Sequence, residues 1–221
     1  MYRYFENEIE EVKSDIIKMT VLTRKMIQES YDALKEKDVE KAKKIIESDE
    51  EVDRLEIIIE DKCTEIILRH HPLAKDLRFV LSAIKMANEL ERIADLGVNI
   101  CQRVIEISDR NFFMPLDDIK TMFDIVNNVL FDCLKSFNEK DYELAKKIII
   151  RDEEIDILKN KIYLSIVERY IKKDIQNADA WISLIFVAKH LERIGDHCVN
   201  IAEDIIYMIS SKTVKHHNEE F

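Results

Sequence analysis

Three oxygen-bearing side chains recur at four-residue spacing in two nearly identical stretches of the chain. In order, they are Glu91, Asp95 and Asn99 in the first stretch, and Glu192, Asp196 and Asn200 in the second. Each four-residue step turns only about 40° around an α-helix, so each set forms one slanting stripe. Carboxylate and amide oxygens are hard ligands that suit Mg²⁺, Mn²⁺, Ca²⁺ or iron. The two stripes are therefore candidate metal-binding sites.

The similarity between the two halves extends beyond the stripes. Residues 36–46 resemble residues 139–149, and residues 49–53 resemble residues 152–156. Self-similarity at a period of about a hundred residues predicts a duplicated unit. Apolar residues recur every three or four positions, and the chain has only 2 Gly and 2 Pro, so long helices joined by short loops are expected.

The predicted fold is all-α, with two tandem three-helix bundles of long antiparallel helices. In the first half the spacing predicts helices over 7–35, 38–69 and 77–108, with a turn at His70-His71-Pro72. Residues 109–115 read as a linker in which Phe112 and Phe113 are packed. The predicted units are 1–109 and 115–211, followed by a polar tail at 212–221.

Folding the second and third helices of each half into a hairpin brings further carboxylates to the height of the stripes, because the rise per residue is equal in both arms. Asp53 comes level with Glu91 and Asp49 with Asp95; the matching pairs of the second half are Asp156 with Glu192 and Asp152 with Asp196. Partly desolvated carboxylates that face one another need protons or cations. The simpler alternative is a solvated acidic face paired to Lys or Arg.

The composition limits the classes of molecule that the protein is expected to bind. The net charge of -11 argues against binding to nucleic acid or to anionic lipid, because both would be repelled. The chain has no apolar run of the roughly 20 residues that a membrane span needs. The four Cys form no C-x-x-C pair and read as reduced thiols. A soluble, cytoplasmic protein is expected, which can still dock on a membrane complex.

Three segments, 73–78, 90–100 and 190–203, closely resemble the PhoU family of phosphate-transport regulators, and the resemblance covers nearly the whole chain. It implies two three-helix bundles that carry multinuclear metal clusters, with iron expected first and Zn, Mn, Mg or Ca as alternatives. It also implies negative regulation of phosphate uptake and of the phosphate-starvation response, through a phosphate ABC transporter ATPase and a sensor histidine kinase. The oligomeric state is left open, with a homodimer among the options.

Carried over residue by residue, the resemblance implies that the six stripe residues are metal ligands. It implies the same for the four aspartates at the same height on the neighbouring helices, Asp49, Asp53, Asp152 and Asp156. Arg92 and Arg193 also match the pattern, but on a helical wheel they point away from the metal. His197 has no counterpart in the first half, so a ligand role for it is limited to the second half.

Two other functions compete with a binding regulator. A ferritin-like metal enzyme or storage protein would use Glu-x-x-His on two helices, and no His here has Glu three residues before it. A metal-free helical adaptor is the second alternative. We expect a protein that works by binding and not by catalysis.

Overall fold

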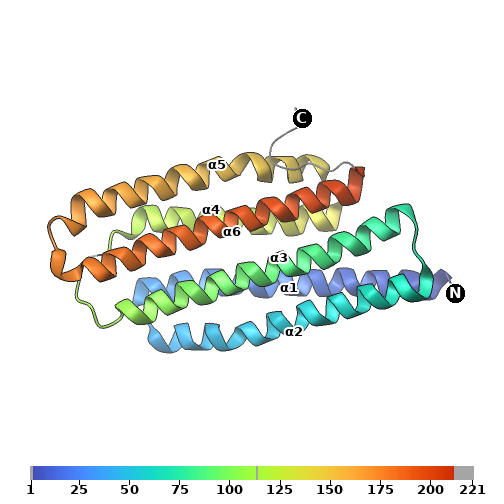
Figure 1. Cartoon of the computed structure of the whole chain (residues 1–221), viewed down its shortest axis with the longest axis horizontal. Coiled ribbons are helices and arrows are strands. Elements are labelled where there is room, and N and C mark those ends of the chain that lie inside the picture. Colours follow the sequence, from blue (N-terminus) through green and yellow to red (C-terminus); the bar gives the residue numbers. More distant parts are fainter. Residues whose placement is uncertain (1, 113, 212–221) are drawn as a thin grey trace.

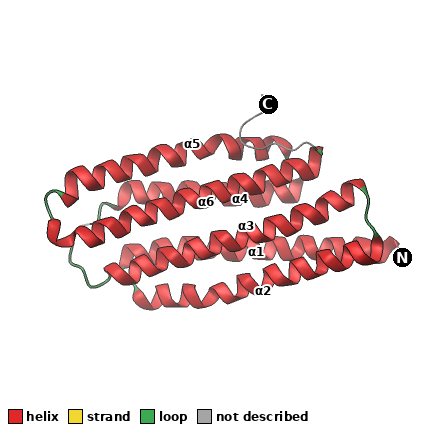
Figure 2. Cartoon of the chain, in the orientation of Figure 1, coloured by secondary structure: helices red, strands yellow, loops and turns green. Residues whose placement is uncertain are grey.

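The computed structural model describes residues 2–112 and 114–211. Within them the chain forms six long α-helices and no strand (Figure 2), which confirms the all-α fold of two duplicated three-helix bundles. The helices are α1 (Tyr2–Glu36), α2 (Val39–His70), α3 (Ala74–Ile107), α4 (Leu116–Glu139), α5 (Tyr142–Ser165) and α6 (Ala178–Ser210). The predicted domain bounds remain predictions, and the polar tail lies outside the described residues.

The six helices are arranged around a central antiparallel pair, α3 and α6, which carry the two copies of the acidic stripe (Figure 1). Helix α2 packs on α3 and helix α5 packs on α6, so that α2 and α5 lie at opposite edges. Helices α1 and α4 pack against each other and against their own hairpins. The two hairpins that hold the stripes therefore lie side by side through α3 and α6.

The start of each hairpin is fixed by the same capping residue. The Asp38 side chain accepts a hydrogen bond from Lys41 N, and the Asp141 side chain accepts one from Leu144 N, each at 2.9 Å. Such caps satisfy backbone donors that have no partner within the helix. The predicted start of the second helix at Asp38 is confirmed.

The turns of the two hairpins differ. Helix α2 ends at His70, and its C-cap residue His71 adopts a left-handed conformation with φ 47°. Helix α5 instead continues into a π-helical segment, Ile166–Ile171, and the chain then forms a short 3₁₀ turn, Ile175–Asn177. The two-residue difference between the repeats lies in this region, where the sequence pattern did not predict a π-helical segment.

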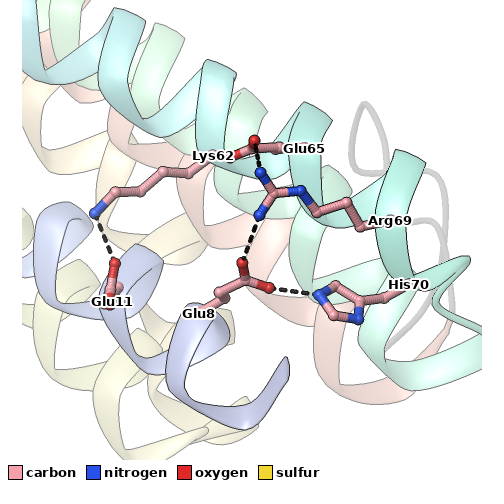
Figure 3. A network of polar contacts seen from close by, with 6 residues as sticks. All are labelled: Glu8, Glu11, Lys62, Glu65, Arg69 and His70. Carbon is pink, nitrogen blue, oxygen red and sulfur yellow. Dashed lines mark hydrogen bonds and ion pairs between the residues drawn. The ribbon is translucent and has the colours of Figure 1, made fainter. Parts of the chain in front are cut away.

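Helix α1 begins at Tyr2, five residues earlier than predicted, because its first turns pack against the end of α2. The Phe5 ring centre lies 5.1 Å from that of His70, and His70 Nε2 lies 2.5 Å from Glu8 Oε2. Arg69 also contacts Glu8, and Lys62 pairs with Glu11 at 3.2 Å (Figure 3). His70 therefore has a carboxylate partner in addition to its place at a helix end.

Phe112, in the linker between the halves, is packed against other residues, as predicted. Its ring packs edge-on against Trp181, with 4.8 Å between the ring centres, and Lys37 Nζ lies 4.6 Å above it. Phe113 lies outside the described residues. All four Cys are buried and free, which agrees with the expected reduced thiols. None of the described helices combines the length and apolar character needed to cross a membrane.

Candidate metal-binding site

In the first half, α2 and α3 bring the four predicted carboxylates together. Burial and, to a smaller extent, the charges of Asp53 and Asp95 together raise the pKa of Asp49 to about 6. The pKa of Glu91 is raised to about 7, chiefly by burial and by the charge of Asp95, with Arg92 opposing the shift and Glu56 and Asp53 adding smaller contributions. These mutual effects place the residues within electrostatic reach of one another, as the hairpin heights predict.

Two of the carboxylate oxygens in this first-half group are buried without a hydrogen bond. Within the described part of the chain, Asp49 Oδ1 and Glu91 Oε2 find no hydrogen-bond partner. A buried oxygen of this kind costs free energy unless a donor or a cation satisfies it. The first-half group therefore combines carboxylates of like charge with two buried oxygens that have no hydrogen bond.

Arg92 does not point away from this group, which corrects the wheel-based prediction. Its Nε lies 3.2 Å from Glu91 Oε2, and its Nη1 lies 3.4 Å from Asp95 Oδ2. The Arg92 side chain is 53% exposed, and exposed ion pairs contribute only about 0–1 kcal/mol. A long, flexible side chain reaches back over its neighbours although its Cβ points elsewhere. Arg92 thus reduces the repulsion around Glu91 but does not remove it.

The second half has the same acids but also has lysines among them. Lys159 Nζ donates to Asp156 Oδ1 at 2.7 Å and to Glu192 Oε1 at 2.9 Å. Lys189 Nζ donates to Glu192 Oε2 at 2.5 Å. Both oxygens of the buried Glu192 therefore face an ammonium group. The pKa of Asp196 is raised by burial and then by Glu192, while Lys189 opposes the shift.

The two lysines have no counterpart in the first half. In the register that aligns Asp152 with Asp49 and Glu192 with Glu91, Lys159 corresponds to Glu56 and Lys189 to Asn88. There, Asn88 Nδ2 donates to Glu56 Oε1 at 3.2 Å. Comparing the halves beyond the acidic positions would have revealed this difference, which the motif alone does not contain.

Gly195 allows α5 to approach α6 closely beside the second-half acids. A Cβ at this position would lie 2.8 Å from Ile155 Cδ1 and 3.1 Å from Asp152 Oδ1. The first half has Ala94 at the corresponding position. Close packing of the two helices therefore accounts for this glycine.

The amide residues of the stripes take different positions from the acids. Asn200 Nδ2 donates to Glu89 Oε2 at 3.1 Å, and His197 Nδ1 lies 2.6 Å from the same oxygen. Glu89 belongs to α3, so Asn200 and His197 connect the two halves. Asn99 is half-buried about two turns along α3 from Glu91. His197 is thereby a contact between helices.

The chemistry of the first-half group fits a hard cation. Asp49, Asp53, Glu91 and Asp95 supply only oxygen donors. Asp49 Oδ1 and Glu91 Oε2 are buried without a hydrogen bond, although Arg92 Nε lies 3.2 Å from the latter. Among the described residues, no three His, Cys, Asp or Glu side chains are already arranged closely enough to hold an ion. An ion would therefore have to draw the carboxylates inward, against repulsion that its own charge removes.

We expect the metal-free protein to become more stable as the pH falls from 8 to about 5. The folded chain holds the pKa of Asp49 at about 6 and that of Glu91 at about 7, above their values in the unfolded chain. The folded state then binds more protons in this window, so the free energy of unfolding rises by about 2 kcal/mol as the pH falls. Urea unfolding in the presence of a chelator, at several pH values, measures this change in the free energy of unfolding.

The control for this pH dependence is the Asp49→Asn/Glu91→Gln double variant, in which the titrating groups are gone. Its free energy of unfolding should change much less between pH 8 and 5. Equal slopes for the two proteins would contradict the assignment of the effect to these carboxylates.

Removing both lysines should make the second half resemble the first. The Lys159→Met/Lys189→Met variant leaves the buried Glu192 without a counter-charge, which should lower the free energy of unfolding by about 2 kcal/mol at pH 8. Added Mn²⁺ should recover more stability in this variant than in the original chain. Lys43→Met, which removes an exposed ammonium group, should change the stability by less than about 0.5 kcal/mol. Equal losses in the two variants would refute the role of the lysines.

The comparisons with known proteins agree with the duplicated architecture. A family model for the PhoU domain matches residues 16–104 and 119–205. The chain is 35% identical to "Phosphate-specific transport system accessory protein PhoU homolog 1" of Thermotoga maritima, over 96% of this chain and 91% of that protein. It is 29% identical to the Escherichia coli "Phosphate-specific transport system accessory protein PhoU", over 96% of this chain and 88% of that protein.

Solved structures extend the similarity to the whole fold. PhoU from Pseudomonas aeruginosa superposes with a TM-score of 0.89 at 28% identity, covering 94% of this chain and 100% of that one. The phosphate transport system regulatory protein PhoU from Streptococcus pneumoniae gives a TM-score of 0.88 at 25% identity, covering 96% and 100%. With two matched PhoU domains and relatives aligned over nearly its full length, the chain belongs to the PhoU family.

Proposed function

We propose that this protein is a metal-binding regulator of phosphate homeostasis. Its relatives are named as accessory proteins of a phosphate-specific transport system, which supports a role in the control of phosphate uptake. In this proposal the protein acts in the cytoplasm as a negative regulator of phosphate uptake and of the phosphate-starvation response. Its partners are the ATPase of a phosphate ABC transporter and a sensor histidine kinase.

The observation that supports metal binding most strongly is the first-half group of carboxylates. Asp49 and Glu91 each have a buried oxygen without a hydrogen bond, and each carries a raised pKa because of burial and neighbouring negative charge. A divalent cation bound there would supply the positive charge that the half-exposed Arg92 does not provide in full. It would also fix the position of α2 relative to α3. The shape of the surface of this hairpin would then depend on whether the ion is bound.

Iron is the expected ion, and Mn²⁺, Mg²⁺, Ca²⁺ and Zn²⁺ are the alternatives. An all-oxygen ligand set favours the harder ions of this group. In the second half, the two lysine ammonium groups already contact Glu192 and Asp156. Binding of an ion there requires the lysines to move, so the first half is the stronger site in this proposal.

A role in binding has more support than one in catalysis. The α2–α3 group brings four carboxylates together and includes no His, whereas ferritin-like metal enzymes and storage proteins use Glu-x-x-His. The remaining alternative is a helical adaptor that acts without metal. The two differ in one measurable property, which is whether an ion changes the stability of the α2–α3 hairpin.

We expect Mn²⁺ or Fe²⁺, added to chelator-treated protein, to raise the free energy of unfolding by about 2–3 kcal/mol at a hundredfold excess over the dissociation constant. The Asp49→Asn/Glu91→Gln variant should lose this gain because it removes two ligand charges. Glu47→Gln, at an exposed position of α2, serves as the matched control and should keep the gain. If metal stabilises all three proteins equally, the ion binds elsewhere; if it stabilises none, the metal-free adaptor is correct.

In cells grown with ample phosphate, the Asp49→Asn/Glu91→Gln variant should raise expression of phosphate-starvation genes several-fold over the original chain. Loss of the ion would change the hairpin surface that the transporter and kinase contact. Reporter expression and partner pull-down, compared at equal protein levels with Glu47→Gln as the control, measure the effect. Full repression and normal pull-down by the double variant would separate the regulatory function from the metal.

A further inference from the structure

A cavity lies between the two halves, at the end of the molecule where α1 begins and α6 ends (Figure 1). Residues of α1, α3, α4 and α6 line it, together with the residue that caps the end of α4. Its volume is about 510 Å³, within the range of about 300–1,000 Å³ that is typical of small-molecule sites. None of the predicted metal ligands lines this cavity.

One part of the cavity lining is apolar. The rings of Phe79 on α3 and Phe137 on α4 stack there, with 6.1 Å between their centres and 22° between their planes. Phe137 is only 1% exposed, and Met208 and Ile209 of α6 extend the same apolar lining. An apolar group that binds against these side chains is removed from water, which favours binding in proportion to the area buried.

The charged side chains of the lining have no partner. Among the described residues, no hydrogen bond or ion pair is made by the side chains of Lys13, Lys75, Lys140, Glu6, Glu10 and Asp76. Lys13 is half-buried, whereas the other five are exposed. A partly desolvated ammonium group without a counter-charge costs free energy, and an anion bound beside it would offset this cost.

Lys140 lies at nearly the same height as Lys13, on the facing side of the cavity. Helices α1 and α4 are antiparallel, and Tyr31 packs on Phe123 with 5.2 Å between the ring centres. This register places Lys140 within about one residue of the height of Lys13. Two ammonium groups at one height on neighbouring helices can hold a single carboxylate between them.

The duplication of the fold does not by itself produce this cavity. Helix α1 has 35 residues and α4 has 24. In the register of the repeat, Leu116, the first residue of α4, corresponds to Lys13. The lining residues Glu6, Ile9 and Glu10 therefore belong to a part of α1 that has no helical counterpart in the second half.

We propose that this cavity binds a small amphipathic anion of the fatty-acid type. The apolar chain of the ligand lies against Phe79 and Phe137, and its carboxylate lies between Lys13 and Lys140. This ligand class satisfies the two properties of the lining together, because it covers the apolar side chains and supplies the negative charge that the lysines lack.

The acids of the lining favour a free molecule over the surface of an anionic membrane. Helices α1 and α3 run in the same direction, and Ile27 lies against Gly97. This register puts Glu6 level with Asp76, about 10 Å along α1 from Lys13. Two carboxylates at this end, on a chain with a net charge of -11, would repel an anionic bilayer. A single carboxylate bound at the lysine end avoids them.

Isothermal titration calorimetry of the full chain with decanoate tests the proposal. We expect one decanoate per chain, with a dissociation constant below about 1 mM. The neutral alcohol 1-decanol has the same chain without the charge and should bind at least tenfold more weakly. Absence of saturable decanoate binding up to about 5 mM would overturn the proposal, and so would equal binding of the alcohol.

Substitution of the two lysines tests where the carboxylate lies. Lys13→Ala/Lys140→Ala should weaken decanoate binding about tenfold. Lys35→Ala/Lys135→Ala is the matched control, because it removes two exposed lysines of α1 and α4 outside the cavity, and it should bind decanoate like the original chain. Circular dichroism confirms that each variant folds. Equal decanoate binding by the two double variants would overturn the assignment of the site.

Discussion

The burial of like-charged carboxylates side by side is the constraint around which this structure is organised. Each half places acids from two helices at the same height beside an apolar core. Burial disfavours the ionised form, and each neighbouring charge adds to the effect, which is why the pKa of Glu91 reaches about 7. A bundle of this kind must bind protons, incorporate its own cations or recruit them from solution.

The two halves meet this constraint differently. The second half contains Lys159 and Lys189, whose ammonium groups contact both oxygens of Glu192. The first half has Glu56 and Asn88 at these positions, and its buried oxygens remain without a hydrogen bond. The second-half group therefore has two lysine counter-charges on its buried glutamate, whereas Glu91 in the first half is paired with the half-exposed Arg92. In the proposed function, the second-half group has a structural role and the first-half group responds to an ion.

The central helices connect the two halves. Glu89 on α3 contacts His197 and Asn200 on α6, and Lys85 on α3 pairs with Asp204 on α6 at 2.8 Å. A change in the position of α3 relative to α2 would thus reach α6 through direct contacts. In the proposed function, an ion bound in the first half would in this way affect surfaces of the second.

The heights of the acids could be predicted from sequence because the rise of a helix depends only on the number of residues. This is why Asp49 and Asp95, which lie 46 positions apart, were expected to be neighbours, and the pKa of Asp49 reflects that proximity. Long flexible side chains follow no such rule. The reach of Arg92, and the insertion of Lys159 and Lys189 among the acids, depend on tertiary packing. The early start of α1 and the π-helical segment after α5 also depend on tertiary packing.

Anomalous diffraction from crystals grown with Mn²⁺ would test the central claim most directly. The account predicts a peak within about 2.2 Å of carboxylate oxygens of Asp49 and Glu91. It also predicts that Lys159 and Lys189 remain in contact with Glu192 in the same crystals. No peak between α2 and α3, or equal peaks in both halves with the lysines still in place, would contradict it.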